Sequence, residues 1–183
     1  FKNEIFTFKK NILKINELIL KFDGSFAMIG DDLNILLTYD APKNNFRNFL
    51  SMVPVVYKKD FSEIQTEGTL ALDGFIKGIY NENNLPSFGI DINIENASFK
   101  YPDLPYPVDN IFVDIEVKNP GGDFDNTIID VKDLRLKMIN NPIDMRMIVK
   151  KPVSDPYIDG KLAGVFDLSD IQKVYPLTDR ESL

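Results

Sequence analysis

The acidic pair Asp123 and Asp125 is the first place to look for site chemistry in this sequence. It follows Gly121-Gly122, and carboxylates in a glycine-rich loop can hold a calcium ion. The twelfth position counted from Asp123 is Leu134, however, where an EF-hand loop requires a glutamate. Close carboxylate pairs also arise by chance in a chain with 28 acidic residues. We therefore predict a solvated turn here and no metal site.

The chain lacks the side chains that most often organise nucleophilic catalysis. It has no His and no Cys, which removes imidazole-assisted hydrolysis, thiol chemistry, disulfides and zinc sites of the Cys/His kind. Ser25 follows a single glycine, without the second glycine of a nucleophile elbow. Gly74 and Gly78 are expected inside a strand, where glycine marks a bend and not a phosphate loop. We predict no catalytic residue, no cofactor and no enzymatic activity.

The overall charge argues against a second group of functions. The formal net charge of −7 and an isoelectric point near 4.7 argue against nonspecific electrostatic binding to nucleic acid or to anionic membrane surfaces. No stretch approaches the roughly 20 consecutive apolar residues that span a bilayer. The chain begins at Phe1 without a leader, so we expect any targeting or membrane segment to lie outside it.

Apolar and polar residues alternate along most of the chain, as they do in strands with one wet face. Prolines lie between the alternating runs or at their ends and mark connectors. The pattern predicts a mostly β chain with about ten strands. The alternating apolar residues are Leu33, Ile35, Leu37 and Tyr39; Leu70, Leu72 and Ile76; Ile90, Ile92 and Ile94; Ile111, Val113, Ile115 and Val117; Leu134, Leu136 and Met138; Ile143, Met145, Met147 and Val149; and Ile158, Leu162, Phe166 and Leu168.

Two segments have helical spacing instead. Residues 44–52 and 167–175 each carry apolar residues three and four apart and are followed by a proline, so both predict short amphipathic helices. We interpret Phe46, Phe49, Leu50 and Val53 as a structural cap on one end of the sheet, which protects its edge from pairing with other chains, and less readily as a lipid gate.

A repeat is also visible within what we predict to be one β-rich domain, residues 1–183. Glu17 to Phe22 matches Asp133 to Met138, and each is followed by a turn, another alternating strand and a proline. We interpret residues 17–54 and 133–176 as two copies of one unit, although the second copy inserts a strand before its helix.

An open sheet of about ten strands is roughly 50 Å wide, and two short helices cannot cover one face of it. Its apolar face then exceeds the few hundred Å² that monomers usually expose. Three solutions remain open. The sheet folds onto itself as a sandwich or barrel, a partner protein covers it, or an elongated curved sheet forms an apolar groove for acyl chains.

A series of short turn and packing motifs is more specific than the strand pattern. These motifs are Phe49-Leu50-Ser51-Met52-Val53-Pro54, Tyr57-Lys58-Lys59-Asp60-Phe61, Gly68-Thr69-Leu70-Ala71-Leu72-Asp73-Gly74, Tyr101-Pro102-Asp103-Leu104-Pro105, Asn119-Pro120-Gly121-Gly122 and Pro152-Val153-Ser154-Asp155-Pro156. Their order and spacing resemble the C-terminal region of AsmA-like proteins from Bacteroidetes-type bacteria, over roughly residues 30 to 178.

The resemblance implies a piece of a large envelope protein with a long periplasmic, β-rich body, anchored in the inner membrane by a helix absent from this chain. Proteins of the AsmA and TamB group are regarded as bridges whose apolar groove helps phospholipid reach the outer membrane and supports outer-membrane assembly. It thus implies phospholipid acyl chains as partners and a lipid groove lined by the alternating apolar residues, Ile35 among them. Exposed edge strands could join other envelope proteins by strand addition.

Two hypotheses of different class follow. The first is a non-catalytic lipid-binding or lipid-conducting segment with a continuous apolar trough. The second is a structural or interaction module of a cell-envelope complex with a closed β core, filled by its own second sheet or by a partner. A third and weaker hypothesis is an enzyme whose catalytic groups are only carboxylates, Lys or Tyr.

Overall fold

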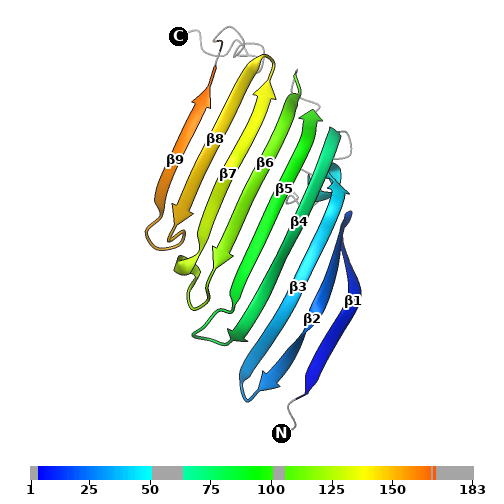
Figure 1. Ribbon diagram of the computed structural model, residues 1–183, viewed down its shortest axis with the longest axis vertical. Helices are drawn as coiled ribbons and strands as arrows, with labels where there is room; N and C mark the ends of the chain where they lie inside the picture. Colours follow the sequence, from blue (N-terminus) through cyan, green and yellow to red (C-terminus); the bar gives the residue numbers. More distant parts are fainter. Residues whose placement is uncertain (1–3, 51–63, 101–105, 166, 168–183) are drawn as a thin grey trace, which may run out of the picture.

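The computed structural model describes residues 4–50, 64–100, 106–165 and 167. They form one antiparallel sheet of nine strands whose spatial order is their sequence order (Figure 1). The prediction of a mostly β chain is confirmed. The strands are β1 (Ile5–Ile15), β2 (Leu18–Ile29), β3 (Asp32–Asn45), β4 (Gln65–Tyr80), β5 (Ser87–Lys100), β6 (Val108–Asn119), β7 (Ile128–Met138), β8 (Asn141–Lys150) and β9 (Tyr157–Gly164).

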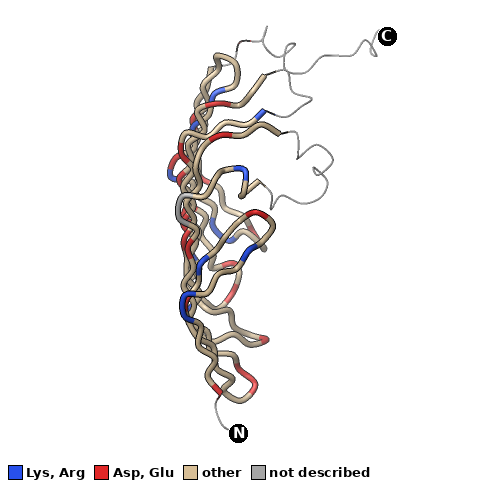
Figure 2. Tube along the Cα trace, turned by 90° about the vertical axis from the view of Figure 1, so that its right-hand side faces the viewer, with Lys and Arg blue, Asp and Glu red and all other residues tan. Residues whose placement is uncertain are grey.

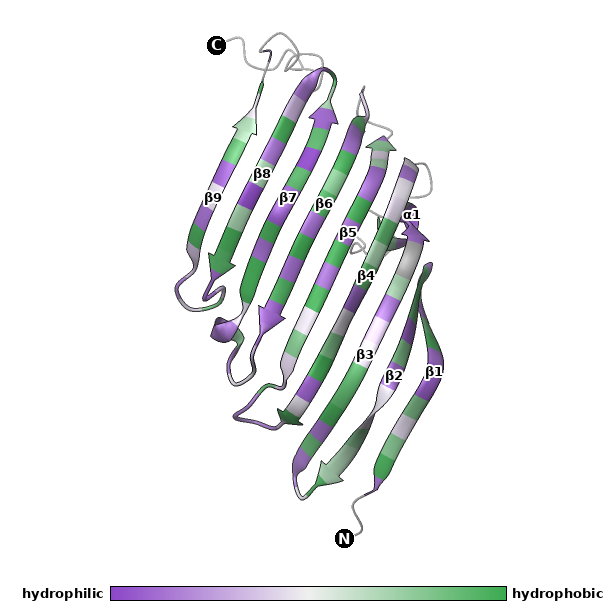
Figure 3. Ribbon diagram, viewed as in Figure 1, coloured by the Kyte–Doolittle hydropathy of each residue, from purple (hydrophilic) through white to green (hydrophobic). Residues whose placement is uncertain are grey.

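The alternation in the sequence becomes two different faces of this sheet, because side chains along a strand point alternately to opposite sides. The strand registers keep the two sets apart, so that Leu70 lies opposite Ile94 and Ile94 lies opposite Val113. Hydropathy bands run along every strand in Figure 3. The apolar face carries Leu13, Leu18, Phe26, Met28, Ile35, Tyr39, Leu70, Leu72, Ile92, Ile94, Val113, Ile115, Val131, Leu134, Met145, Met147, Ile158 and Leu162. The polar face carries Lys21, Asp40, Asp73, Lys77, Asp91, Asn93, Asp114, Glu116, Lys118, Asp130, Asp144, Arg146, Asp159 and Lys161.

Two glycines allow backbone conformations and close strand contacts that a residue with a side chain could not adopt. Gly68 has a φ of +101° at the bulge between Glu67 and Thr69, and an added Cβ would stand 2.4 Å from the Cα of Ala97. Gly24 on β2 has a φ of +151°, and its Cβ would stand 2.1 Å from the carbonyl oxygen of Leu36. Only glycine fits such backbone positions, so these two residues allow the long strands to stay paired.

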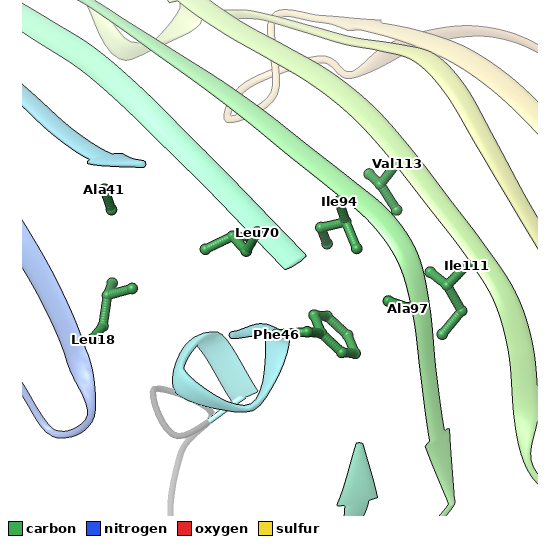
Figure 4. Close-up of a cluster of buried hydrophobic side chains, with 8 residues drawn as sticks. All are labelled: Leu18, Ala41, Phe46, Leu70, Ile94, Ala97, Ile111 and Val113. Atoms are coloured by element: carbon green, nitrogen blue, oxygen red, sulfur yellow. The ribbon is translucent and has the colours of Figure 1, made fainter. Parts of the chain in front are cut away.

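One helix, α1 (Phe46–Leu50), packs on the apolar face, next to β3 and β4. Phe46 points from α1 toward the sheet and is 5% exposed (Figure 4). The core lies beneath it and consists of Leu18, Ala41, Leu70, Ile94, Ala97, Ile111 and Val113, with Phe49 and Leu50 packed against it. The first predicted helix is therefore confirmed over Phe46–Leu50. Residues 51 and 52, and Val53, lie outside the described part of the chain.

One expectation about helices stays a prediction and another is corrected. The second helix, predicted for residues 167–175, stays a prediction, because only Asp167 of that range lies in the described residues. The sequence analysis did not predict the 3₁₀ turn η3 (Phe124–Asn126). The helix α1 does not protect a sheet edge, because it lies over the interior strands β3 and β4 while the edges are β1 and β9. A short helix that directly follows β3 reaches the face of the sheet beside that strand.

The described sheet stays open. Figure 2 shows it nearly edge-on as a single bowed layer, with the short helix on its concave side. Strands β1 and β9 each have one neighbour, and in the described residues no second sheet lies against the apolar face. The sandwich or barrel alternative is therefore wrong for this part of the chain. The internal repeat stays a prediction: Glu17 to Phe22 spans the start of β2, whereas Asp133 to Met138 ends β7.

Candidate functional site

The apolar face is the largest chemically distinct surface of the described sheet. Beneath α1 it is closed to water, with Leu18 and Leu70 at most 1% exposed. Away from the helix it opens, and Leu13 on β1, Met28 on β2 and Leu162 on β9 are 46%, 49% and 65% exposed. The same face is therefore a small core at one place and, in the part of the chain that the structure describes, an exposed apolar surface at both margins.

The predicted groove residue Ile35 lies in this surface on β3. It stands opposite Phe26 of β2 and Gly78 of β4 and is half-buried. The remaining alternating residues of the prediction also share the face, from Ile90 and Ile92 on β5 to Ile158 and Leu162 on β9. Phe166 and Leu168 lie outside the described residues.

An aromatic cluster occupies the β1–β2 end of the apolar face. The rings of Phe6 and Phe8 lie across from Phe22 and Phe26, with centroids 5.1 to 5.7 Å apart. Gly24 lies between the two phenylalanines of β2 and directly opposite Phe8, so it leaves space for that ring. The four rings form a continuous patch that alternation alone did not single out, because β1 was not among the alternating runs of the sequence.

Tyr39 ties three strands of this face together. It lies on β3 opposite Gly74 of β4, and a Cβ on that glycine would stand 2.5 Å from the Tyr39 Oη. The Tyr39 hydroxyl donates a hydrogen bond of 3.4 Å to the carbonyl oxygen of Gly89 on β5. Burial, helped by the charge of Asp73, raises the pKa of Tyr39 above its usual value. The phenol thus stays neutral and serves as an anchor across the strands.

The polar face carries a row of carboxylates that only the strand register reveals. Asp40, Asp73, Asp91, Glu116 and Asp130 lie opposite one another on five successive strands, β3 to β7. Like charges directly opposite destabilise a sheet. Burial, and then the charges of Glu116 and Asp73, raises the pKa of Asp91.

Lysines neutralise part of this row. The Lys118 Nζ lies 2.6 Å from the Glu116 Oε1, and the Lys132 Nζ lies 3.6 Å from the same oxygen. The hydrogen bond from Lys118 is the main cause that lowers the pKa of Glu116. Across the described residues, no group of three or more acidic side chains is arranged to hold a metal ion.

The acidic pair in the glycine-rich loop has a structural role. Asp123 Oδ1 accepts a hydrogen bond of 2.8 Å from the backbone N–H of Asp125 and thereby caps η3. Asp125 Oδ1 accepts bonds of 3.0 Å from the N–H groups of Val153 and Ser154, in the connection between β8 and β9. Hydrogen bonding by Ser154, first through its side chain and then its backbone, lowers the pKa of Asp125. The pair therefore fixes the loops at this end of the sheet.

No family model, curated protein or solved structure matches the chain. In the described ranges, no helix has the length and apolar character needed to cross a membrane.

Proposed function

We propose that this chain is a non-catalytic lipid-binding or lipid-conducting segment of an AsmA-like envelope protein. In this proposal the apolar face contacts phospholipid acyl chains, and the whole protein, anchored in the inner membrane through another segment, supports phospholipid transport to the outer membrane and outer-membrane assembly. The segment itself lies in the periplasm. The observation that carries the proposal is an apolar face that extends over all nine strands, of which the described residues cover only a small part, with one five-residue helix.

The energetic argument starts from water contact. Removing apolar surface from water is favourable by about 25 cal/mol per Å², or about 0.8 kcal/mol for each CH₂ group buried. Monomeric soluble proteins rarely leave more than a few hundred Å² of contiguous apolar surface exposed. A nine-stranded sheet is roughly 40 Å across, since neighbouring strands lie about 4.8 Å apart. An occupant of this face therefore gains binding energy from burial alone.

The chemistry of the face favours acyl chains as that occupant. Its side chains are aliphatic and aromatic, and they offer no row of charges for a headgroup to bind. Headgroups can remain in water at the margins, while the hydrocarbon lies along the strands. The carboxylate row lies on the opposite face, where it keeps that side of the sheet hydrated.

A partner protein could cover the same face, as in the alternative of a structural or interaction module. The open sheet does not fit the version of this alternative in which the described strands form a closed core by themselves. The version with a protein partner is distinguished from the lipid proposal by what copurifies with the chain.

The test is native mass spectrometry with lipid extraction on the chain purified gently from a bacterial envelope. A variant with Leu13, Met28 and Leu162 changed to Asp removes apolar character from exposed positions of the apolar face. The matched control changes Ile12, Leu36 and Ile79 to Asp and so adds the same three negative charges. These three residues lie on the polar face, where their exposed fractions are 68%, 53% and 43%.

We expect phospholipid to copurify with the wild type and with the control but not with the apolar-face variant, while circular dichroism shows all three folded. A lipid-free wild type contradicts the proposal. Equal lipid loss in both variants also contradicts it, because binding would then not depend on the apolar face.

A further inference from the structure

Strand β9 has no neighbour on its outer edge among the described strands, and this edge is suited to pair with β9 of a second copy of this chain. All eight residues of β9 are exposed, and its pairing with β8 is regular from Tyr157 to Gly164, without a bulge. Edge strands are commonly protected by bulges, prolines or inward-pointing charges, none of which interrupts Tyr157–Gly164. The β1 edge differs, since it has a bulge between Phe8 and Asn11 and carries Lys9, Lys10 and Lys14.

The ladder shows which backbone groups of β9 face outward. The N–H of Val165 donates to the carbonyl oxygen of Pro142 at 3.2 Å, which continues the β8–β9 ladder by one residue. Hydrogen-bonded positions alternate in an antiparallel pair. The backbone groups of Asp159 and Lys161 therefore point at β8, and those of Ile158, Gly160 and Leu162 point to the open edge.

The side chains of β9 favour one register for self-pairing. With Gly160 opposite Gly160 of the second copy, Asp159 lies opposite Lys161 and Ile158 lies opposite Leu162, each twice by symmetry. The charged pairs then lie on the polar face and the apolar pairs on the apolar face. Shifting the centre by one residue brings Lys161 opposite Lys161 or Asp159 opposite Asp159, and like charges in such positions are unfavourable.

This register also matches the outward backbone groups. Ile158, Gly160 and Leu162 meet each other as hydrogen-bonded pairs, whereas Asp159 and Lys161 meet at the closer positions between those pairs. Within the described chain neither charged residue forms an ion pair, and Lys161 lies directly opposite Arg146 of β8. Asp144 lines the same shallow depression as Lys161 but forms no ion pair with it. A carboxylate from a second copy would offset the two like charges that the β8–β9 register places opposite each other.

The topology disfavours the other ways of extending the sheet. Strands β1 and β9 run in the same direction, because eight antiparallel steps separate them. Joining β9 to β1 of another copy with the apolar faces on one side therefore makes a parallel pair, which is less stable per residue. Joining two β1 edges brings their lysines together. We propose that the chain forms a symmetric dimer through antiparallel β9–β9 pairing centred on Gly160, which makes one continuous sheet.

This proposal goes beyond the proposed function, and it is tested by the oligomeric state instead of lipid content. Sedimentation velocity on residues 1–183 compares the wild type with Asp159→Lys, Lys161→Asp and the variant that carries both changes. Each single change creates two like-charge pairs across the interface, and we expect it to raise the dissociation constant of the dimer about tenfold or more. The variant with both changes restores both pairs, so we expect it to restore the dimer. Lys9→Asp on β1 reverses the same kind of charge at the other edge and leaves the dimer intact.

The register is tested by crosslinking, since the chain has no cysteine of its own. Asp159→Cys mixed with Lys161→Cys places two thiols opposite each other, about 4.5 Å apart between Cα atoms. This separation permits a disulfide. In either variant alone the Cα atoms are about 8 Å apart, too far for a disulfide.

We expect oxidised dimer from the mixture only. A monomeric wild type overturns the proposal, as does a dimer that resists both single charge changes. Crosslinking of a single cysteine variant with itself, or none in the mixture, overturns the register centred on Gly160.

Discussion

Two leucines on the apolar face provide a direct test of whether that face is open. Leu70 on β4 is 0% exposed beneath α1, whereas Leu13 on β1 is 46% exposed. Truncating a fully buried leucine to alanine costs about 2–5 kcal/mol, and we expect about 3 kcal/mol for Leu70→Ala because a one-turn helix above it can settle into part of the space. Leu13→Ala removes a side chain about half in water already, so half of a burial worth about 2 kcal/mol gives about 1 kcal/mol.

The measurement is equilibrium unfolding in urea followed by circular dichroism, supported by melting temperatures. For a chain of this size about 1 kcal/mol lowers the melting temperature by about 2–4 °C, so the two variants should differ by about 4–8 °C. Ile12→Ala, on the polar face of the same strand, serves as the control for a general weakness of β1. A cost at Leu13 equal to that at Leu70 would refute the open face, because it would require Leu13 to be covered as completely as the core.

Three further predictions concern the backbone and the carboxylates. Gly24→Ala should lower the free energy of unfolding by more than about 3 kcal/mol, because the added Cβ would overlap a backbone oxygen. Gly30 has a φ of +66° and open space around it, so Gly30→Ala should lower the free energy of unfolding by about 1 kcal/mol. Equal melting temperatures of the two variants would contradict this prediction. Asp91→Asn should stabilise the protein near neutral pH by about 0.5 kcal/mol, because a raised pKa means that the folded state resists ionisation of this carboxyl. That gain should shrink as pH falls through the folded pKa of Asp91, and a pH-independent gain would count against the ionisation of this carboxyl, which burial and then the charges of Glu116 and Asp73 disfavour, as its cause. The pKa of Asp125 is lowered in the folded state, so its ionised carboxylate stabilises the fold above the unfolded pKa of about 3.9, and this stability is lost as pH falls through the folded pKa. The free energies of unfolding of Asp125→Ala and the wild type, measured in urea, should therefore converge in acid. A difference that stays constant with pH would contradict this link between ionisation and stability.

The sequence by itself determined most of the strands and their two faces, although β1 (Ile5–Ile15) was not among its alternating runs. Side-chain direction in a strand depends only on whether a position is odd or even, so the run from Ile90 to Ile94 assigns a face without knowledge of its neighbours. The helix at Phe46–Leu50 was equally local, because its spacing and the proline beyond it lie within a few residues. The type of each element was thus encoded where it forms.

The tertiary structure alone decided what the strands build. An alternating sequence fits a sandwich, a barrel and an open sheet equally well, since all three bury one face of each strand. The row from Asp40 to Asp130 depends on the register of five strands, which bulges shift by single residues. Asp125 likewise finds Ser154 29 residues away, and only the pairing of β7 with β8 brings them together. Contacts between distant residues follow from how all the strands fit at once, and no local pattern contains that information.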